Sequence, residues 1–250
     1  MSVALPSLPA IVWLESIPST NVEAQERFAS GETGSLWIAA RQQTHGKGRL
    51  GREWVSRPGN LYASLLLPVE CPVSVLPSLS LVAGLAVRDA LMATGVEAAL
   101  ELKWPNDVLL GGRKVSGILI ETANHANRLA AIIGCGLNLS HHPVETRWPA
   151  THLAEHTINT DPEAMLTRLA TTMAQRICQW DNGAGLSHIR HDWMDAAMGR
   201  GTKVVLDDGS SGVFDGLHDT GALIVRNEDG TVKHYHAGDV KWVDIRGAGT

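Results

Sequence analysis

The sequence predicts an α+β fold in which a mixed-sheet domain, residues 1–198, is followed by a small C-terminal β-barrel, residues 199–250. Up to residue 198, predicted strands and helices alternate without a regular repeat, which favours a mixed sheet. After Gly199, short β-branched strands are separated by Asp208-Gly209, Thr220-Gly221 and Asp229-Gly230, the pattern of an all-β module. The 250 residues are 44% hydrophobic, enough for one sizeable core and a small second one.

The first elements are a strand at Ile11–Glu15 and a helix that begins around Pro18-Ser19-Thr20-Asn21. Thr20 and Glu23 have the spacing of a capping box, and Gly31 is placed to end the helix. A second strand, Leu36–Arg41, then leads into a glycine-rich loop.

The middle of the chain predicts a buried strand and a core helix. Leu61–Leu67 is almost entirely apolar, as expected of a strand covered on both faces. Helical spacing links Leu79, Val82, Ala83, Ala86, Val87, Ala90 and Leu91, with Pro77 before them and Gly95 after them.

The remaining elements of the first domain are four strands and two helices. A hairpin is expected where Gly111-Gly112 joins two of the strands. The predicted strands are Ala99–Lys103, Val108–Leu110, Lys114–Thr122 and Leu129–Leu139, and the predicted helices are Pro162–Trp180 and Leu186–Ala197.

Composition and charge exclude several classes of protein. The formal charge of −5, from 21 Lys+Arg against 26 Asp+Glu, argues against general nucleic-acid binding. The apolar run Val75–Val87 stops at Arg88 and is too short to span a bilayer, and no basic residue precedes Arg27. Three cysteines without a Cys-x-x-Cys pair predict neither a disulfide framework nor a zinc site, so we expect a cytoplasmic protein.

The loop Gly46–Trp54 concentrates three cations, three glycines and a tryptophan in nine residues. Glycine allows close backbone approach and the cations attract an anion, so the loop is suited to a phosphate or a carboxylate. Gly46-x-Gly48-x-x-Gly51 matches a dinucleotide fingerprint, but Arg57-Pro58-Gly59 prevents the helix that such a site needs. The alternative is a flexible basic surface turn, which Trp54 disfavours because it adds a stacking face.

A second motif, Lys103-Trp104-Pro105-Asn106-Asp107, is followed by Lys114 at the start of a strand. Pro105 stiffens the exit from the preceding strand, and a strand is a rigid support for a catalytic charge. In isolation, Asp107 could equally be a turn residue and Lys114 an exposed edge charge.

The histidines and cysteines are less informative. The pairs His141-His142 and His152/His156 are incomplete as metal motifs, so we predict no metal ligands in the chain. Cys135 lies in an apolar strand and is expected in the core rather than as a nucleophile.

Taken together, these motifs resemble biotin–protein ligases, in the family's order from about Ile11 to Ile245. The resemblance rests on Ser19-Thr20-Asn21, Gln43, Gly46–Trp54, Lys103–Asp107, Lys114–Gly117 and Gly134–Asn138. It implies a biotin/lipoate ligase-like catalytic domain with an SH3-like C-terminal barrel. It also implies activation of biotin by ATP with Mg²⁺ to biotinyl-5'-adenylate, and transfer to a lysine of a biotin carboxyl carrier protein, without a tightly bound prosthetic group.

The resemblance assigns roles to individual residues. Lys114, Arg49 and Asp107 would be catalytic, with Asp107 orienting the incoming lysine and able to deprotonate it. Biotin would be bound by Ser19, Thr20, Asn21, Gln43, Lys47, Gly48, Arg49, Lys114 and Gly117, and the nucleotide by Lys47, Arg49, Arg52, Trp54, Asn106, Lys114 and Asn138. If Thr20 binds biotin, its hydroxyl cannot serve only as a cap of the helix. The loop would order over the intermediate as a lid and be poorly ordered without ligand.

Some features depart from the family pattern. Lys47 and Leu50 stand where many members carry arginine, and Asp215 and His218 make a direct role of the barrel in ATP binding doubtful. About ten residues precede the first strand, too few for a DNA-binding module, and a homodimer is allowed but not fixed by the residues.

Three alternatives remain open. A lipoate or octanoate ligase or transferase shares the catalytic fold, a nucleic-acid-binding module would use Arg41–Arg57, and the barrel could recognise a peptide.

Overall fold

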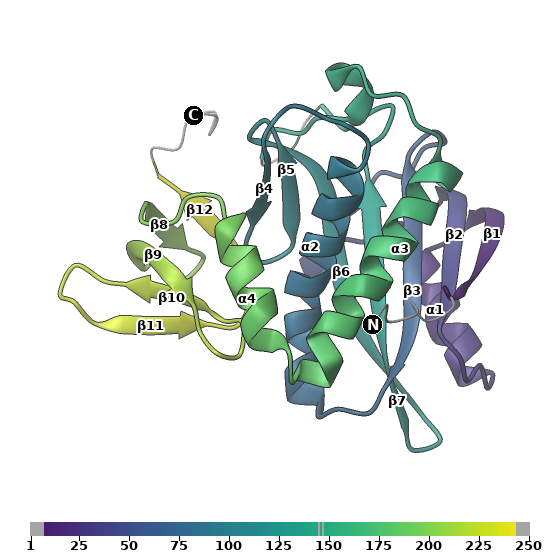
Figure 1. The fold of residues 1–250 in the computed structure, drawn as a ribbon, viewed down its shortest axis with the longest axis horizontal. Helices are drawn as coiled ribbons and strands as arrows, with labels where there is room; N and C mark the ends of the chain where they lie inside the picture. The colour runs from purple at the N-terminus through teal and green to yellow at the C-terminus, as the bar shows by residue number, and fades with distance from the viewer. Residues whose placement is uncertain (1–7, 145, 147, 244–250) are drawn as a thin grey trace, which may run out of the picture.

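The computed structural model describes residues 8–144, 146 and 148–243, so the predicted limits at residues 1 and 250 and at Ile245 lie outside the described residues. The chain forms a seven-stranded and a five-stranded sheet side by side (Figure 1). The strands of the first sheet are β1 (Ala10–Ile17), β2 (Leu36–Gln43), β3 (Leu61–Val69), β4 (Leu100–Lys103), β5 (Asp107–Leu110), β6 (Arg113–His125) and β7 (Arg128–Leu137).

The first sheet is mixed, as predicted. Its strand order is β1-β2-β3-β7-β6-β5-β4. Only β1 and β2 pair in parallel, because α1 (Thr20–Ala29) forms the crossover between them, and every other neighbouring pair is antiparallel. Seven consecutive residues of β3, Leu61–Leu67, are buried, which confirms a strand covered on both faces.

Helices cover both faces of this sheet. On one face α1 packs Ala24 and Phe28 against Ile38, Leu66 and Ile132. The larger core lies on the other face, beneath α2 (Leu79–Met92), α3 (Pro162–Trp180) and α4 (Leu186–Asp195) (Figure 1). This layering leaves the strand ends and their loops free to form a site.

The most apolar helical stretch is Val73–Met92, which joins a 3₁₀ turn to α2. Its length of 20 residues and its mean hydropathy of 1.5 would allow it to cross a membrane, but 67% of the apolar window is buried inside the protein. The stretch is therefore a core helix, because ten residues of α2 are buried.

The capping box predicted at Thr20 and Glu23 is wrong. Ser19 occupies the N-cap position without a side-chain cap, and Glu23 instead pairs with Arg27 at 2.8 Å. The Thr20 N–H donates to Gln43 Oε1 at 2.8 Å, so a side chain from the end of β2 satisfies the helix start. Thr20 is thereby kept for tertiary contacts.

Two hairpins bring the motifs of the second half together. The predicted turn at Gly111-Gly112 is confirmed, and both residues have positive φ, 57° and 75°, as a tight hairpin turn requires. A second hairpin between β6 and β7, turning at Ala126 and Asn127 with φ of 48° and 62°, was not predicted. Its turn contains no glycine, which removes the usual signal.

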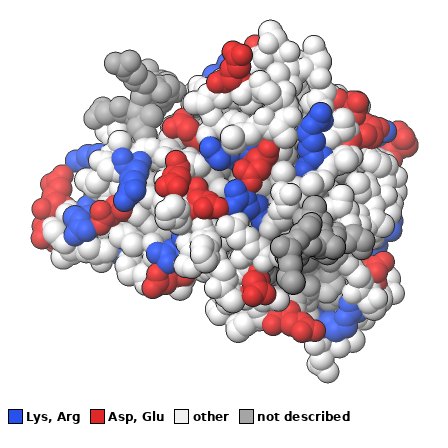
Figure 2. Space-filling view, in the orientation of Figure 1, with Lys and Arg blue, Asp and Glu red and all other residues white. Residues whose placement is uncertain are grey.

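The C-terminal module is an antiparallel five-stranded sheet of order β11-β10-β9-β8-β12. Its strands are β8 (Lys203–Leu206), β9 (Ser211–Leu217), β10 (Leu223–Arg226), β11 (Val232–Tyr235) and β12 (Val240–Trp242). The predicted division at residues 198 and 199 lies between α4 and β8. Positive and negative side chains are interspersed over the face that carries the helices (Figure 2), which does not resemble a nucleic-acid-binding stripe.

Candidate active site

Every residue predicted for the site lines one cavity of about 830 Å³. Its walls come from the start of α1, the end of β2, the glycine-rich loop, the β5–β6 hairpin, the segment after β7, and β12. The predicted residues found there are Ser19, Thr20, Asn21, Gln43, Lys47, Gly48, Arg49, Arg52, Trp54, Asn106, Asp107, Lys114, Gly117 and Asn138. The volume suits a ligand larger than a single small ring.

One end of the cavity is a buried polar network. Ser64 Oγ lies 2.6 Å from Thr20 Oγ1 and 2.5 Å from Asn21 Oδ1. Gln43 Oε1 accepts from Thr20, and Gln43 Nε2 donates to Ser56 Oγ at 2.9 Å. These hydroxyl and amide groups are fixed by one another, so they present a preorganised set of donors and acceptors.

Asn21 reaches this network because a glycine faces it. Asn21 Nδ2 donates to Glu121 Oε2 at 2.7 Å, and a Cβ on Gly134 would lie 2.3 Å from Asn21 Oδ1. Only glycine at position 134 therefore leaves room for the amide.

The other end is charged. Lys114 Nζ lies 2.6 Å from Asp107 Oδ1, and Lys103 Nζ lies 3.7 Å from Asp107 Oδ2. Arg49 Nη1 donates to Asn106 Oδ1 at 3.3 Å. The Asn106 side chain is held in turn by the Ile118 carbonyl at 2.7 Å. Several cations thus converge around one carboxylate, which leaves net positive charge for an anionic ligand.

The pKa of Asp107 reflects two opposing effects. Burial alone would raise the pKa, but the charges of Lys114 and Lys103 outweigh it and hold the pKa below its ordinary value. Asp107 is therefore a carboxylate at neutral pH. For Arg49 the pKa is lowered, with burial as the main cause, but the guanidinium stays charged.

The backbone of Lys114 is held on both sides by the segment after β7. The Lys114 N–H donates to the Pro149 carbonyl at 2.7 Å, and the Thr151 N–H donates to the Lys114 carbonyl at 2.9 Å. The side chain is 24% exposed, into the cavity. A rigid backbone with a partly exposed ammonium is what a catalytic charge needs.

The glycine-rich loop is joined to the C-terminal module. Arg49 donates to the Gly238 carbonyl at 3.2 Å and lies 3.7 Å from Asp239, which also pairs with Arg52. Asp239 is itself held by its N–H, which donates to Asp207 Oδ2 at 2.6 Å. These contacts describe a closed position of the loop. The predicted disorder without ligand stays a prediction.

Trp54 lies flat against the sheet. A Cβ on Gly136 would be 2.5 Å from the indole Cε2, and Lys114 Nζ is 5.3 Å from the ring centroid. The indole Nε1 is buried and has no hydrogen-bond partner among the described residues.

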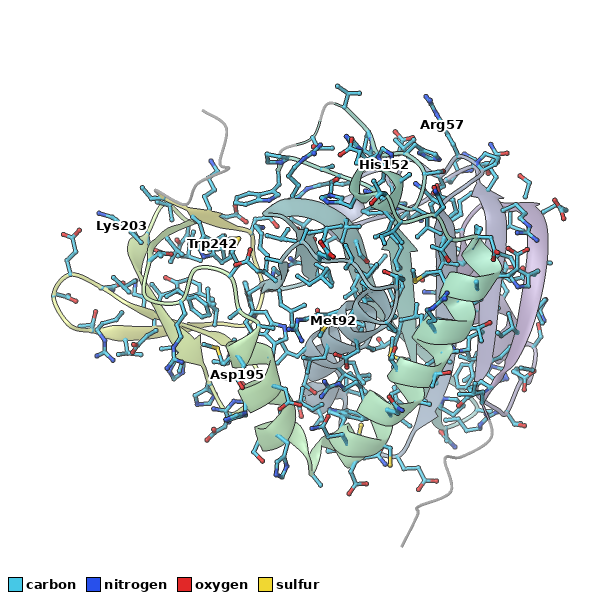
Figure 3. All side chains as sticks on the ribbon, turned by 45° about the horizontal axis from the view of Figure 1, so that its top comes forward. Arg57, Met92, His152, Asp195, Lys203 and Trp242 are labelled. Atoms are coloured by element: carbon cyan, nitrogen blue, oxygen red, sulfur yellow. The ribbon has the colours of Figure 1, made fainter. Side chains whose placement is uncertain are left out.

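The C-terminal wall was missed by sequence reasoning. Lys103 Nζ sits 5.0 Å from the rings of both Trp148 and Trp242, and these two rings meet edge to face at 6.5 Å. Figure 3 shows Trp242 on the side of the C-terminal module. Only Lys103 stands at the end of a predicted strand, and nothing in the sequence spacing connects Trp148 or Trp242 with it.

Two further residues considered in the sequence, Asn138 and Cys135, are buried in the cavity wall. Asn138 is buried, and its Nδ2 donates to the Thr151 carbonyl at 3.0 Å, so part of its amide holds the cavity wall. Cys135 lines the cavity but is buried, and burial raises the pKa of its thiol to about 12. This confirms the expectation that Cys135 lies in the core.

The chemistry available here is that of joining two anions. The polar end can bind a neutral polar ring, the cations can neutralise a carboxylate and a phosphate where they meet, and the aromatic wall offers flat faces.

Comparison with known proteins agrees with this geometry. Residues 13–138 match the biotin/lipoate A/B protein ligase family, and residues 198–241 match the biotin protein ligase C-terminal domain. A biotin–[acetyl-CoA-carboxylase] ligase of Paracoccus denitrificans is 40% identical over 223 residues, covering 85% of this chain and 92% of the relative.

Solved structures are similar over nearly the whole chain. Biotin protein ligase from Aquifex aeolicus in complex with biotin and ATP has a TM-score of 0.78 at 30% identity, covering 94% of this chain and 98% of that one. The Leishmania major enzyme in complex with biotinyl-5-AMP has a TM-score of 0.66 at 25% identity, covering 92% and 99%.

Proposed function

The chain belongs to the biotin protein ligase family, and from this premise we propose how its cavity carries out the two half-reactions. The enzyme is an ATP-dependent ligase that activates biotin and transfers it to a biotin-dependent carboxylase. One observation carries the assignment of residues: the polar network and the cation cluster line the same cavity.

The polar network binds the biotin ring system. A cyclic urea has two N–H donors and one carbonyl acceptor, which match the mixed hydroxyl and amide groups of Ser19, Thr20, Asn21 and Gln43. Ser19, Thr20 and Asn21 are buried, which makes their hydrogen bonds specific, because an analogue that leaves one unmade leaves a buried polar group unpaired.

In the first half-reaction the biotin carboxylate oxygen attacks the α-phosphorus of ATP. An O–P bond forms, the bond to the β-phosphate breaks, and pyrophosphate leaves. Lys114 and Arg49 neutralise the charge that accumulates where the two anions meet, and Lys47 and Arg52 add positive charge from the loop. The loop closed on Asp239 keeps water from the mixed anhydride.

In the second half-reaction the amine of an acceptor lysine attacks the activated carbonyl, an amide forms, and AMP leaves. Asp107 is the carboxylate next to this position, and its lowered pKa makes it a poor proton acceptor. We assign it to orient the incoming ammonium and the Lys114 side chain. The ammonium gives one proton to water to become the attacking amine, and a second proton passes to water as the amide forms.

The nucleotide brings Mg²⁺ as part of the proposal. The carboxylates lining the cavity near the cations, Asp107 and Asp239, are both engaged by lysine or arginine, so they do not form a dedicated cage. This donor set fits a hydrated Mg²⁺ held mainly by phosphate oxygens, and Asp107 or Asp239 would accept hydrogen bonds from its water while staying paired with the cations. The ion would offset phosphate charge when bound.

The direct test is to incubate the protein with biotin, Mg-ATP and a carboxyl-carrier domain, and to measure the intact mass of the carrier. A mass increase of one biotinyl group that requires all three reagents supports the proposal. An unmodified carrier in the presence of active control ligase would refute it.

The lipoate alternative is separated by ATP–pyrophosphate exchange. Exchange stimulated by biotin and not by lipoate is expected, because the buried polar network has no counterpart in a lipoyl chain. Exchange with lipoate alone would reverse the assignment.

Three further parts of the proposal concern the setting of the enzyme. A cytoplasmic location is supported by the unpaired Cys71, Cys135 and Cys178. A homodimer is supported by β1, an edge strand in the described part of the chain whose outer side is open to pairing, and sedimentation tests it. Lack of DNA binding is supported by the net charge of −5, and a mobility-shift assay at low salt tests it.

A further inference from the structure

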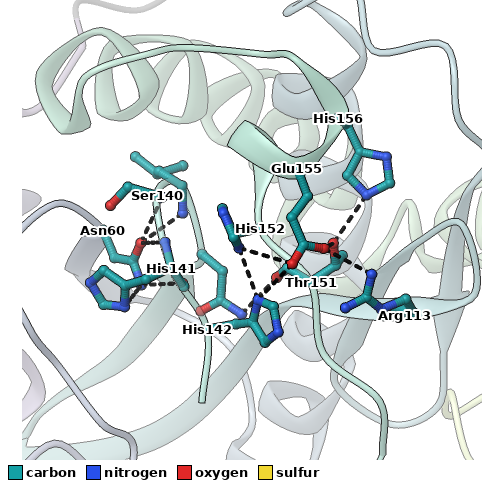
Figure 4. Close-up of polar contacts among 11 residues, drawn as sticks. Asn60, Arg113, Ser140, His141, His142, Thr151, His152, Glu155 and His156 are labelled. Atoms are coloured by element: carbon teal, nitrogen blue, oxygen red, sulfur yellow. Dashed lines mark hydrogen bonds and ion pairs between the residues drawn. The ribbon is translucent and has the colours of Figure 1, made fainter. Parts of the chain in front are cut away.

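Two histidines and a glutamate outside the catalytic cluster meet on the segment that follows β7 (Figure 4). His142 lies in the loop after this strand, His152 is the N-cap of the 3₁₀ helix Leu153–His156, and Glu155 lies within that helix. In the sequence, His141-His142 and His152/His156 are each incomplete as metal motifs, and therefore no metal ligands were predicted. The fold instead combines one histidine from each.

The distances among the three groups are those of one face of a tetrahedral metal site. His142 Nδ1 and His152 Nδ1 are 2.8 Å apart, and each lies 3.6 Å from Glu155 Oε1. Ligands about 2.0–2.1 Å from a zinc ion in tetrahedral geometry are about 3.3 Å apart. The three separations bracket this value, so shifts of about half an ångström would admit the ion.

The carboxylate is already oriented for this role. Its other oxygen, Glu155 Oε2, accepts from Arg113 Nη1 at 2.8 Å and from Thr151 Oγ1 at 2.8 Å. Both bonds turn Oε1 toward the two imidazoles (Figure 4). Partners of this kind, which fix a ligating carboxylate, are a regular part of metal sites.

The two imidazoles are accessible and suited to binding a metal. Their side chains are 16% and 17% exposed, which leaves a path for an ion. His141 is turned away, with Nε2 3.2 Å from the Pro58 carbonyl.

We propose that His142, His152 and Glu155 form a three-ligand site for a divalent transition-metal ion, zinc in the first instance, with water in the fourth position. Two imidazoles and one carboxylate are the ligands of many open zinc sites. The ion would join the two ends of the segment 142–152, whose interior supplies Trp148, Pro149 and Ala150 to the cavity wall. The site is independent of the ligase chemistry proposed above.

The test is zinc binding by the whole protein after removal of metals with a chelator. Titration calorimetry should give one equivalent of bound Zn²⁺, and substitution by Co²⁺ should give the intense visible bands of a four-coordinate ion. His152→Ala and His142→Ala should each weaken binding more than tenfold, since even changes in residues that orient ligands cost about 10- to 100-fold. His141→Ala, the matched neighbour, should bind as the wild type does.

Thermal unfolding keeps the test valid if a variant is destabilised. At zinc about 100-fold above its Kd, the wild-type Tm should rise by about 5 °C or more. Glu155→Gln preserves the shape of the side chain and should lose most of this rise while remaining folded. Absence of zinc binding in the wild type, or equal binding in wild type, His142→Ala and His152→Ala, would overturn the proposal.

Discussion

Replacing Lys114 by methionine should slow adenylate formation by about 10²–10³-fold. At an effective dielectric constant of about 20, two unit charges about 3 Å apart interact by about 5–6 kcal/mol. The Lys114 side chain is 24% exposed, so water reduces this interaction. Removal of one such charge-stabilising donor typically costs about 2.7–4 kcal/mol, which corresponds to the stated factor.

The fold should survive this change. Asp107 loses its partner at 2.6 Å but keeps Lys103 at 3.7 Å, so no charge is left isolated in the cavity. We therefore expect the Tm to fall by only a few degrees. Lys114→Arg should recover part of the rate because it restores the positive charge.

The assay is single-turnover formation of biotinyl-adenylate from radiolabelled ATP, with product release excluded. Lys203→Met is the matched control, because this exposed lysine of the C-terminal module pairs with Glu228 outside the cavity. A wild-type rate for Lys114→Met, or an equal loss for Lys203→Met, would refute the reasoning.

Three other changes test separate parts of the site. Gly136→Ala should displace Trp54, since the new Cβ would lie 2.5 Å from the indole. The variant should retain the adenylate at least tenfold less well in a filter assay. Gly34→Ala is the control and should retain it normally, because its Cβ meets only Glu32 at 3.7 Å. Asp239→Asn should open the loop, because Asp239 pairs with Arg49 and Arg52. Trypsin should then cleave at Arg49 and Arg52 faster, and the adenylate should leak faster. Cleavage of the control Glu228→Gln as fast as that of Asp239→Asn would contradict this. Because the pKa of Asp107 is lowered in the folded state, its stabilising contribution is complete above the ordinary value of 3.8 and is lost as the pH falls through the lower folded value. Urea unfolding of wild type and Asp107→Asn should therefore differ at pH 7 and converge toward pH 3.

The sequence was sufficient where the signal is local. The buried strand Leu61–Leu67, the helix Leu79–Met92 and the Gly111-Gly112 hairpin each follow from a short pattern, and the structure confirms them. The motif residues also converge on one cavity, because each motif lies at a strand end or in a loop beside the same end of the sheet.

The sequence was insufficient where two distant segments meet. The stacking of Lys103 between Trp148 and Trp242 depends on how the second sheet packs against the first, which no spacing encodes. The false capping box at Thr20 has the same origin: a tertiary partner, Gln43, competes with the local pattern. His142 and His152 are likewise brought together only by the turn of the chain between them.

The two backbone hydrogen bonds that hold Lys114 to Pro149 and Thr151 have a consequence for engineering. An insertion or deletion within residues 149–151 would move the Lys114 ammonium together with the cavity wall. Remodelling that stretch should therefore not adapt the enzyme to biotin analogues. The opposite end, where Asn21 faces Gly134, is tied to the same strand farther along, because Gly134 pairs with Leu119 of β6. Redesign for a bulkier analogue at that end therefore acts on β6 away from Lys114.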